Sequence, residues 1–288
     1  MNEIEQAADL LRAGRLVAFP TETVYGLGAN ALDAAAVARI FEAKGRPLTS
    51  PLIVHVDSIA MARELALEWP AAADALAQHF WPGPLTIVVP KQPRVPDIVT
   101  AGLPSVGLRM PAHPMALALL RAAQIPLAAP SANRFTELSP TAAAHVRAGL
   151  AGRILDGGPC TVGIESTVIS LIGATPRILR PGLVTRPQIE AVIGPVEEGS
   201  GPESPGQHPR HYSPHTPIVL GDSPREGRGF RLDFSNMPFD AAGYAEQLYR
   251  ILHELDIQGY DWIAIEPPPD TPEWAGIRDR LYRAAVAI

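Results

Sequence analysis

Short apolar runs alternate with segments of helical periodicity along the first two thirds of the chain. The apolar runs predict strands over residues 16–19, 52–56, 85–89, 106–110, 127–129 and 167–171. Apolar residues recurring every three or four positions predict helices over 4–13, 34–44 and 113–123. The runs 164–171 and 177–180 are too close for a helical crossover, so we expect them to pair antiparallel. The fold class is therefore α/β, a mixed sheet flanked by helices.

The pattern changes between residues 194 and 217, where proline, glycine and polar residues leave no apolar period. We expect a catalytic domain over 1–200, a linker over 201–217 and a small α/β domain over 218–288. In the last domain the pattern predicts strands over 218–220, 229–234 and 262–265 and a helix over 241–255. A unit this small is expected to depend on docking to the first.

Charge and composition narrow the class of protein. The net charge is −6; residues 1–200 carry 16 basic and 17 acidic side chains, and 201–288 carry 8 and 13. A general nucleic-acid binder would need a broad basic excess, so any anion site must be local. A single cysteine, Cys160, excludes an intramolecular disulfide framework. No apolar run reaches membrane-spanning length and the first residues are acidic, so we expect a cytoplasmic protein without membrane contact.

The glycines of residues 26–31 form a G-x-G-x-x-A pattern, but it is not a dinucleotide fingerprint. Six residues separate it from the preceding strand, and Arg46 stands where an acidic residue is needed. We expect Gly26 and Gly28 to allow a tight turn. No P-loop and no G-x-S-x-G nucleophile elbow is present in the sequence. The histidines at 208, 211 and 215 lack further ligands, so a metal site there is not favoured.

Cations and neutral hydrogen-bonding groups cluster at predicted strand and helix ends. Arg109 interrupts an apolar strand, where a buried guanidinium needs a carboxylate, a phosphate or a cleft. Purely structural roles stay open for several of these residues. Lys44 and Arg46 can complement a helix dipole, His55 can be a core residue, and Ser139 can be a helix cap. Taken together, the groups suit a nucleotide triphosphate and a small carboxylate rather than an acyl-enzyme mechanism.

Nine motifs, in order, resemble the YrdC-like threonylcarbamoyl-AMP synthases in their longer, two-domain form. They are PTETVYGLGANA, KGRP with SPLIVHV, FWPGPLT, VGLRMPAHP, APSAN, SPT, GIESTV, ILRPG and SPGQHPRHYSP. The resemblance implies a YrdC-like twisted mixed sheet and a Rossmann-like C-terminal domain that is shorter than usual. It also implies an enzyme that joins L-threonine, bicarbonate and ATP into threonylcarbamoyl-AMP and pyrophosphate.

The resemblance also implies roles for individual residues. Threonine would be held by Thr23, His55, Arg109, Ala129 and Ser166. ATP would be held by Lys44, Arg46, Ser50, Ser105, Ser131, Asn133, Ser139, Arg180 and Tyr212. Lys44 and Arg46 would act catalytically by neutralising the departing pyrophosphate, and Arg210, His211 and Tyr212 would form a lid that excludes water.

The resemblance implies that Mg²⁺ arrives with ATP and that the protein supplies no metal ligand. Partner proteins would transfer the threonylcarbamoyl group to the adenosine next to the anticodon of certain tRNAs, so tRNA would be only an indirect partner. Two alternatives stay open: a non-catalytic RNA-binding module and a carbamoyl-transfer module like those of hydrogenase maturation factors. The near-neutral first domain and the 6% aromatic content count against RNA binding. The zinc-finger and acylphosphatase segments of the maturation factors have no counterpart in the sequence.

Overall fold

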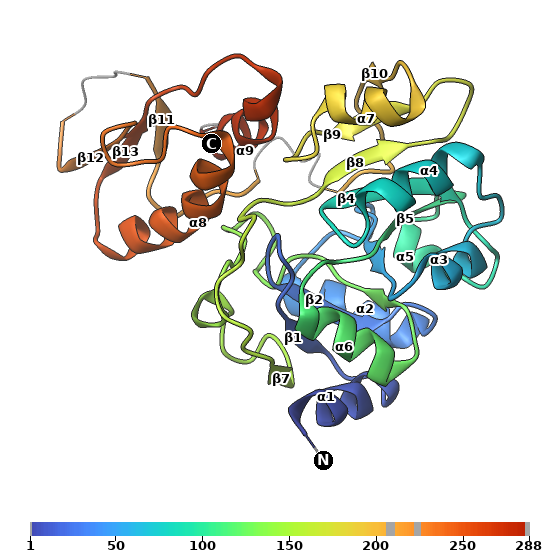
Figure 1. Cartoon of the computed structure of the whole chain (residues 1–288). Helices are drawn as coiled ribbons and strands as arrows, with labels where there is room; N and C mark the ends of the chain where they lie inside the picture. Colours follow the sequence, from blue (N-terminus) through green and yellow to red (C-terminus); the bar gives the residue numbers. More distant parts are fainter. Residues whose placement is uncertain (1, 206–210, 222–225, 286–288) are drawn as a thin grey trace.

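The chain folds around a large mixed sheet and a small parallel sheet. The computed structural model describes residues 2–205, 211–221 and 226–285. The small sheet and its two long helices stand to one side of the large sheet (Figure 1). Within the described residues, no helix has both the length and the apolarity to cross a membrane.

The large sheet runs in the order β10-β9-β8-β4-β5-β3-β6-β2-β1-β7 and mixes parallel with antiparallel pairs. Its strands are β1 Val17–Phe19, β2 Gly26–Asn30, β3 Ile53–His55, β4 Leu85–Pro90, β5 Ser105–Arg109, β6 Leu127–Ala128, β7 Arg153–Ile154, β8 Thr167–Ser170, β9 Arg177–Arg180 and β10 Glu197–Glu198. As expected from their short connection, β8 and β9 pair antiparallel. The expected α/β class with a mixed sheet is confirmed.

Helices cover both faces of the large sheet. They are α1 Glu3–Arg12, α2 Ala34–Lys44, α3 Ile59–Leu65, α4 Ala71–Phe80, α5 Asp97–Thr100, α6 Pro114–Ala123 and α7 Arg186–Ile193, with a 3₁₀ turn at Ala143–His145. In β1, Val17 and Phe19 pack with α1 and α6, whereas Ala18 packs into the core that includes α2, α3 and α4. This alternation with period two places one apolar layer on each face.

Helix boundaries follow local chemistry closely. The Asp33 carboxylate accepts hydrogen bonds from the amides of Ala35 and Ala36, which begins α2, and Gly45 ends it in the left-handed region at φ 62°. These are the standard start and stop signals of a helix, and the sequence predicted the same bounds, 34–44. The helix carries Lys44 at its last position and delivers Arg46 just beyond it.

The small sheet is parallel throughout, in the order β11-β13-β12. Its elements are β11 Ile218–Leu220, β12 Gly229–Leu232, α8 Ala241–Ile257, β13 Trp262–Ile265, the 3₁₀ turn Pro272–Trp274 and α9 Ala275–Ala285. The expected α/β character of this region is confirmed. Its apolar cluster also includes Val24, Leu138 and Ile164 from the large-sheet region, so the two parts share a core.

Glycines allow the two parts to approach closely. A Cβ on Gly163 would stand 2.2 Å from the carbonyl oxygen of Ala245 in α8, and one on Gly276 in α9 would stand 2.8 Å from the Cα of Gly182. Neither contact leaves room for a side chain. The close approach therefore requires glycine at both positions.

The structure corrects one reading of the sequence. Gly26 and Gly28 do not make a tight turn; they belong to β2, which pairs antiparallel with β1. At Gly28 the absent side chain makes room for the Phe19 ring, which would lie 2.8 Å from a Cβ. Glycine within a strand often marks a site where a neighbouring group approaches the backbone closely, as the Phe19 ring does here. The helices α3, α4, α5 and α7 were not predicted.

Replacing Gly163 with alanine tests the close contact between the two parts. Gly163 has φ 79°, and a Cβ added there would clash with the backbone of α8. Gly194 has a similar φ of 81°, but a Cβ added there would meet no atom within 4 Å. We expect Gly194→Ala to cost about 1–3 kcal/mol from its backbone conformation alone, since φ 81° and ψ −168° are adopted almost only by glycine. Gly163→Ala should cost roughly 1–3 kcal/mol more from overpacking, measured by denaturant unfolding. Equal losses at the two positions would contradict the tight contact.

Candidate active site

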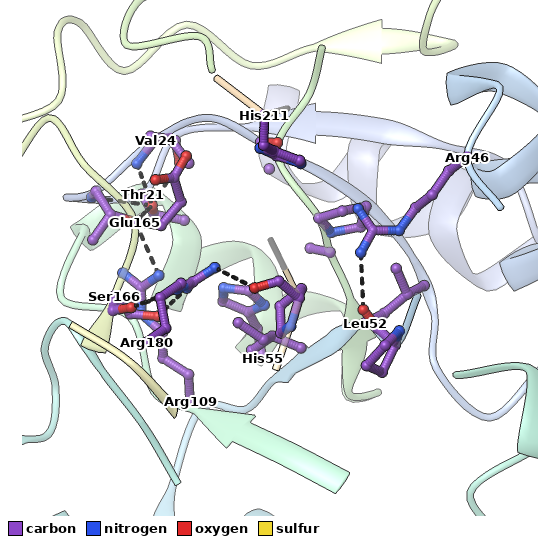
Figure 2. A pocket seen from close by; sticks show the side chains of 18 of the residues that line it. Thr21, Val24, Arg46, Leu52, His55, Arg109, Glu165, Ser166, Arg180 and His211 are labelled. Carbon is purple, nitrogen blue, oxygen red and sulfur yellow. Dashed lines mark hydrogen bonds between the residues drawn. The ribbon is translucent and has the colours of Figure 1, made fainter. Parts of the chain in front are cut away.

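One cavity collects residues that are widely separated in the sequence, from Thr21 to Tyr212. β5 and β9 each end at this cavity with an arginine, Arg109 and Arg180, and Ser166 precedes β8 there. The lining comprises Thr21, Thr23, Val24, Gly26, Arg46, Pro51, Leu52, Ile53, His55, Arg109, Ala129, Pro130, Ser131, Glu165, Ser166, Arg180, Pro205, His211 and Tyr212. In Figure 2, Arg46 lies on one side, and Arg109, Glu165 and Arg180 lie on the other.

Most of the predicted site residues lie together at this cavity. It is lined by Thr23, Arg46, His55, Arg109, Ala129, Ser131, Ser166, Arg180, His211 and Tyr212. Lys44, Ser50, Ser105, Asn133 and Ser139 are not part of the lining. Arg210 lies outside the described residues. Three arginines thus face a single hollow together with a row of neutral polar groups.

Arg109 is buried and held from three sides. Its Nη2 donates to Glu22 Oε1 at 2.6 Å, its Nη1 to Thr23 Oγ1 at 2.9 Å and its Nε to the Gly83 carbonyl at 3.3 Å. Guanidinium has five N–H donors, so two stay open among these contacts. Glu22 offsets the burial cost of the charge and fixes the plane of the fork. The sequence analysis assigned no role to Glu22. Its position between the hydrogen-bonding residues Thr21 and Thr23 was the feature that could have indicated one.

Ser50 holds Arg46 in place. The Arg46 guanidinium donates to the Ser50 hydroxyl and to the Pro51 carbonyl, the latter at 3.0 Å. Its Cζ lies 5.8 Å from the centroid of the Phe135 ring. Burial, and to a smaller degree Arg180, lowers the pKa of Arg46 to about 10, so the group stays charged at neutral pH. Ser50 therefore acts on the cavity through Arg46.

Lys44 is buried beneath the loop that carries Ser131. Its Nζ donates to the Ser131 carbonyl at 2.6 Å, to the Asn133 carbonyl and to Asn133 Oδ1 at 3.4 Å. Burial lowers the pKa of Lys44, and Arg46 lowers it further. All three ammonium donors thus have acceptors in residues 131–133. In this geometry Lys44 positions the loop, and its direct action on a phosphate stays a prediction.

Arg180 and Ser166 form a unit on the other side of the cavity. Arg180 donates to the Ser166 carbonyl from Nε at 3.1 Å and from Nη2 at 2.9 Å, and Nη2 also reaches Ser166 Oγ at 3.2 Å. The Ser166 hydroxyl bonds Thr86 Oγ1 at 2.8 Å. Two donors from one guanidinium on one carbonyl fix its orientation. Burial lowers the pKa of Arg180.

Glu165 lines the cavity, and the site predictions did not include it. Its Oε1 accepts from Ser139 Oγ at 2.5 Å and its Oε2 from Arg280 Nε at 2.7 Å. Burial alone would raise the pKa of this carboxyl, but Arg280, Arg180 and the Ser139 hydroxyl together lower it, so Glu165 is ionised. Ser139 therefore faces Glu165. The adjacency of Glu165 to Ser166 in GIESTV was the sequence signal.

Three buried polar atoms at the cavity lack partners among the described residues. They are His55 Nδ1, His211 Nδ1 and the Tyr212 hydroxyl. Burial, with Arg109 as the second cause, lowers the pKa of His55 to about 3, so its ring is neutral at physiological pH. Burial also lowers the pKa of His211 to about 3. Unsatisfied buried groups are costly, and their convergence indicates where a ligand completes the hydrogen bonding.

The arrangement suits positioning and charge stabilisation. Arg46, Arg109 and Arg180 supply positive charge in a largely water-excluded hollow, where electrostatic interactions are strong. Cys160 is buried and its pKa is raised to about 12 by burial, so it is no nucleophile here. Among the described residues, no three His, Cys, Asp or Glu side chains group as metal ligands.

Two family models together match nearly the whole chain. The Sua5–YciO–YrdC model, described as "Telomere recombination", matches residues 9–182. A second model, described as "Threonylcarbamoyl-AMP synthase, C-terminal domain", matches residues 184–286.

Curated relatives show the same correspondence. The threonylcarbamoyl-AMP synthase of Bacillus subtilis is 42% identical, covering 98% of this chain and 93% of its own. That of Pyrococcus abyssi is 49% identical over 98% of this chain and 94% of its own. The crystal structure of P. abyssi Sua5 complexed with L-threonine superposes with a TM-score of 0.93 at 39% identity, covering 98% of this chain and 94% of that one.

The buried neutral state of His55 predicts a pH-dependent stability. In the unfolded chain histidine takes up a proton near pH 6.5, but the folded pKa is about 3. Between these values the unfolded state binds more protons, so the stability from neutral His55 is complete above pH 6.5 and is lost as pH falls. His55→Asn should flatten the slope of unfolding free energy against pH by about 1.4 kcal/mol per unit within that window. The measurement is denaturant unfolding at several pH values, and an unchanged slope would contradict the buried neutral ring.

Proposed function

The chain belongs to the Sua5–YciO–YrdC family and is a threonylcarbamoyl-AMP synthase, and we propose that its cavity binds L-threonine beside ATP. The reaction joins L-threonine, bicarbonate or CO₂ and ATP, and it releases pyrophosphate. The observation that carries the proposal is the convergence of three buried arginines on one hollow, whose lining also includes three residues that each have a buried, unpartnered polar atom. The carboxylate of threonine and the phosphate chain of ATP would neutralise the arginines and offer hydrogen-bond partners to the unpartnered polar atoms.

The threonine end is proposed at Arg109. The two open N–H donors of its guanidinium match the two oxygens of a carboxylate. Neutral His55, the Ala129 backbone and the Ser166 hydroxyl would contact the amine and the side-chain hydroxyl, with Thr23 holding the arginine fork. The threonine-bound P. abyssi structure, similar over nearly the whole chain, supports threonine as the substrate.

The ATP end is proposed at Arg46 and Arg180. Both are charged and buried, and Ser131 lies on the cavity wall supported by Lys44 and Asn133. Ser50 would act through Arg46, and Ser139 through Glu165. The Tyr212 hydroxyl would donate to the nucleotide. Ser105, buried at the start of β5, keeps its proposed ATP role from the family resemblance alone.

The chemistry needs proximity and charge more than a general base. The threonine amine takes up CO₂ to form a carbamate and releases a proton. A carbamate oxygen then attacks the α-phosphorus of ATP, the new P–O bond forms, and the bond to the β-phosphate oxygen breaks as pyrophosphate leaves. The guanidinium groups of Arg46 and Arg180 would stabilise the charge that develops on the phosphates.

We propose that Mg²⁺ enters as the ATP complex. Glu165 is the one carboxylate that lines the described cavity, and its oxygens are engaged by Ser139 and Arg280. This suits an ion held mainly by phosphates and water. Mg²⁺ would add charge neutralisation at the departing pyrophosphate.

The linker is proposed to act as a lid between the domains 1–200 and 218–288. Pro205, His211 and Tyr212, all from the expected linker, line the cavity together with residues of the large-sheet part. A P. abyssi Sua5 variant with an adjacent histidine and tyrosine changed to alanine has also been solved, with a TM-score of 0.92 at 39% identity. His211–Tyr212 is the only His-Tyr pair in this chain. Excluding water protects a carbamate from hydrolysis.

We further propose that the product serves tRNA modification in the cytoplasm, through separate threonylcarbamoyl-transferase proteins. No broad basic excess supports direct tRNA binding, since residues 1–200 are almost balanced in charge. The alternative, a non-catalytic RNA-binding module, makes the opposite prediction: tight tRNA binding without turnover.

The test of the function is threonine-dependent pyrophosphate release. Purified protein is mixed with ATP, Mg²⁺ and bicarbonate, and pyrophosphate is measured with and without each amino acid. We expect release with L-threonine and little with serine or valine, which lack the methyl or the hydroxyl. Release that ignores threonine would overturn the proposal. Tight tRNA binding without any release would favour the RNA-binding module.

Substitutions at the two ends of the cavity should separate the substrates. Arg109→Ala combined with Glu22→Gln, which removes the carboxylate left unpaired, should weaken threonine about 30-fold, or about 2 kcal/mol, and leave ATP within about twofold. Arg46→Ala should do the reverse. The exposed Arg147→Ala is the matched control and should change neither ligand. Calorimetric titration of each ligand decides, and equal losses of both ligands in either cavity variant would contradict the assignment.

A further inference from the structure

Arg280 of α9 is a fully buried cation that reaches from the small-sheet part into the large-sheet part. Its Nε donates to Glu165 Oε2 at 2.7 Å, its Nη2 to the Glu165 carbonyl at 3.2 Å and its Nη1 to the Pro181 carbonyl at 3.1 Å. Asp279 accepts a further bond from Nη1 at 2.6 Å. A charge buried this deeply is tolerated only when it is paired and hydrogen-bonded in this way. The guanidinium thus fixes both the side chain and the backbone of Glu165.

Through Glu165, this contact reaches the cavity wall. The other carboxylate oxygen of Glu165 accepts from Ser139 Oγ at 2.5 Å, and Tyr249 of α8 donates to Oε2 at 3.2 Å. The next residue, Ser166, is the anchor of Arg180. A displacement of Glu165 would therefore move Ser139, Ser166 and Arg180 together.

Arg280 also supports Tyr212, which lines the cavity. Its Cζ lies 5.1 Å from the centroid of the Tyr212 ring, and the Tyr249 ring stacks on Tyr212 at 6.1 Å. Tyr212 is 1% exposed and adopts φ 61°, a conformation that non-glycine residues hold only under tertiary constraint. The cation–π contact and the stack from α8 and α9 supply that constraint. They hold the unpartnered Tyr212 hydroxyl at the cavity.

We propose that Arg280 is a positioning residue through which the C-terminal part builds the nucleotide half of the active site. The proposal rests on the proposed function, in which Ser139, Arg180 and Tyr212 serve ATP. The described hydrogen bonds of Arg280 and of the Glu165 side chain do not reach Arg109 or Thr23, which serve threonine. Ser166, which the proposed function places beside threonine, is reached only through its backbone link to Glu165. The support is therefore stronger for ATP than for threonine.

Arg280→Met tests this preference, because it keeps an unbranched side chain that replaces the aliphatic stem of arginine and removes the guanidinium. We expect ATP affinity to fall at least about tenfold and threonine affinity to fall by no more than about threefold, the smaller loss coming through Ser166. Arg278→Met on the same helix is the matched control, since Arg278 bonds Asp270 and the carbonyls of Pro269 and Thr271 away from the cavity. The control should bind both ligands as wild type does. Calorimetric titrations of the full chain give both affinities.

Two milder variants test the same contact if Arg280→Met does not fold. Tyr249→Phe removes one hydrogen bond to Glu165 with no loss of volume, and it should weaken ATP about threefold at a melting temperature within about 2 °C of wild type. Arg280→Lys keeps the charge and loses the fork, so its ATP affinity should lie between those of Arg280→Met and wild type.

The outcomes separate the two proposals. Unchanged ATP affinity in Tyr249→Phe and in a folded Arg280 variant, or equal loss of ATP and threonine, would overturn the positioning role. Wild-type protein that binds neither ligand and releases no pyrophosphate would instead overturn the proposed function.

Discussion

The burial of several guanidinium groups around one hollow is the constraint on which the rest of the structure depends. Arg46, Arg109 and Arg180 line the cavity, and each is buried. Such charges are expensive to remove from water, so each donates to fixed carbonyls, hydroxyls or a carboxylate. These contacts restrict the arginine side chains to single conformations. The site is consequently preorganised for an anionic ligand before one arrives.

The strained backbone conformation of Tyr212 at the cavity is stabilised by packing against residues outside the cavity. Tyr212 sits in the left-handed region with its hydroxyl unpaired, and its ring contacts Tyr249 and Arg280. Local strain persists only where surrounding structure determines it. The groups that pack here come from α8 and α9, so the conformation of Tyr212 depends on the C-terminal part of the chain. This links one wall of the cavity to the docking of the small sheet.

Helix ends, strands and the residues at their termini could be predicted from the sequence. Contacts between residues far apart in the chain could not. The bounds of α2 followed from Asp33 and Gly45, and the strand that carries Arg109 followed from its apolar run. The glycines of β2 misled because the ring they accommodate, Phe19, lies on the neighbouring strand. Arg280 was unpredictable because its partner, Glu165, is 115 positions away and α9 alone appears as an ordinary amphipathic helix. Residues at strand ends could be grouped by topology, whereas a contact between a distant helix and a loop leaves no periodic signal.

Sharing of the apolar core makes the two parts thermodynamically interdependent. Val24, Leu138 and Ile164 belong to the cluster formed by α8, α9 and the small sheet, and Ile164 directly precedes Glu165. A small three-stranded unit buries too little surface to be stable alone, so it gains from these contacts. The same contacts order the segments that carry Ser139 and Ser166. Separating the small sheet from the large one would therefore expose apolar surface and loosen the wall of the cavity that includes Glu165 and Ser166 in one step, because the residues that close the core are neighbours of those that line the site.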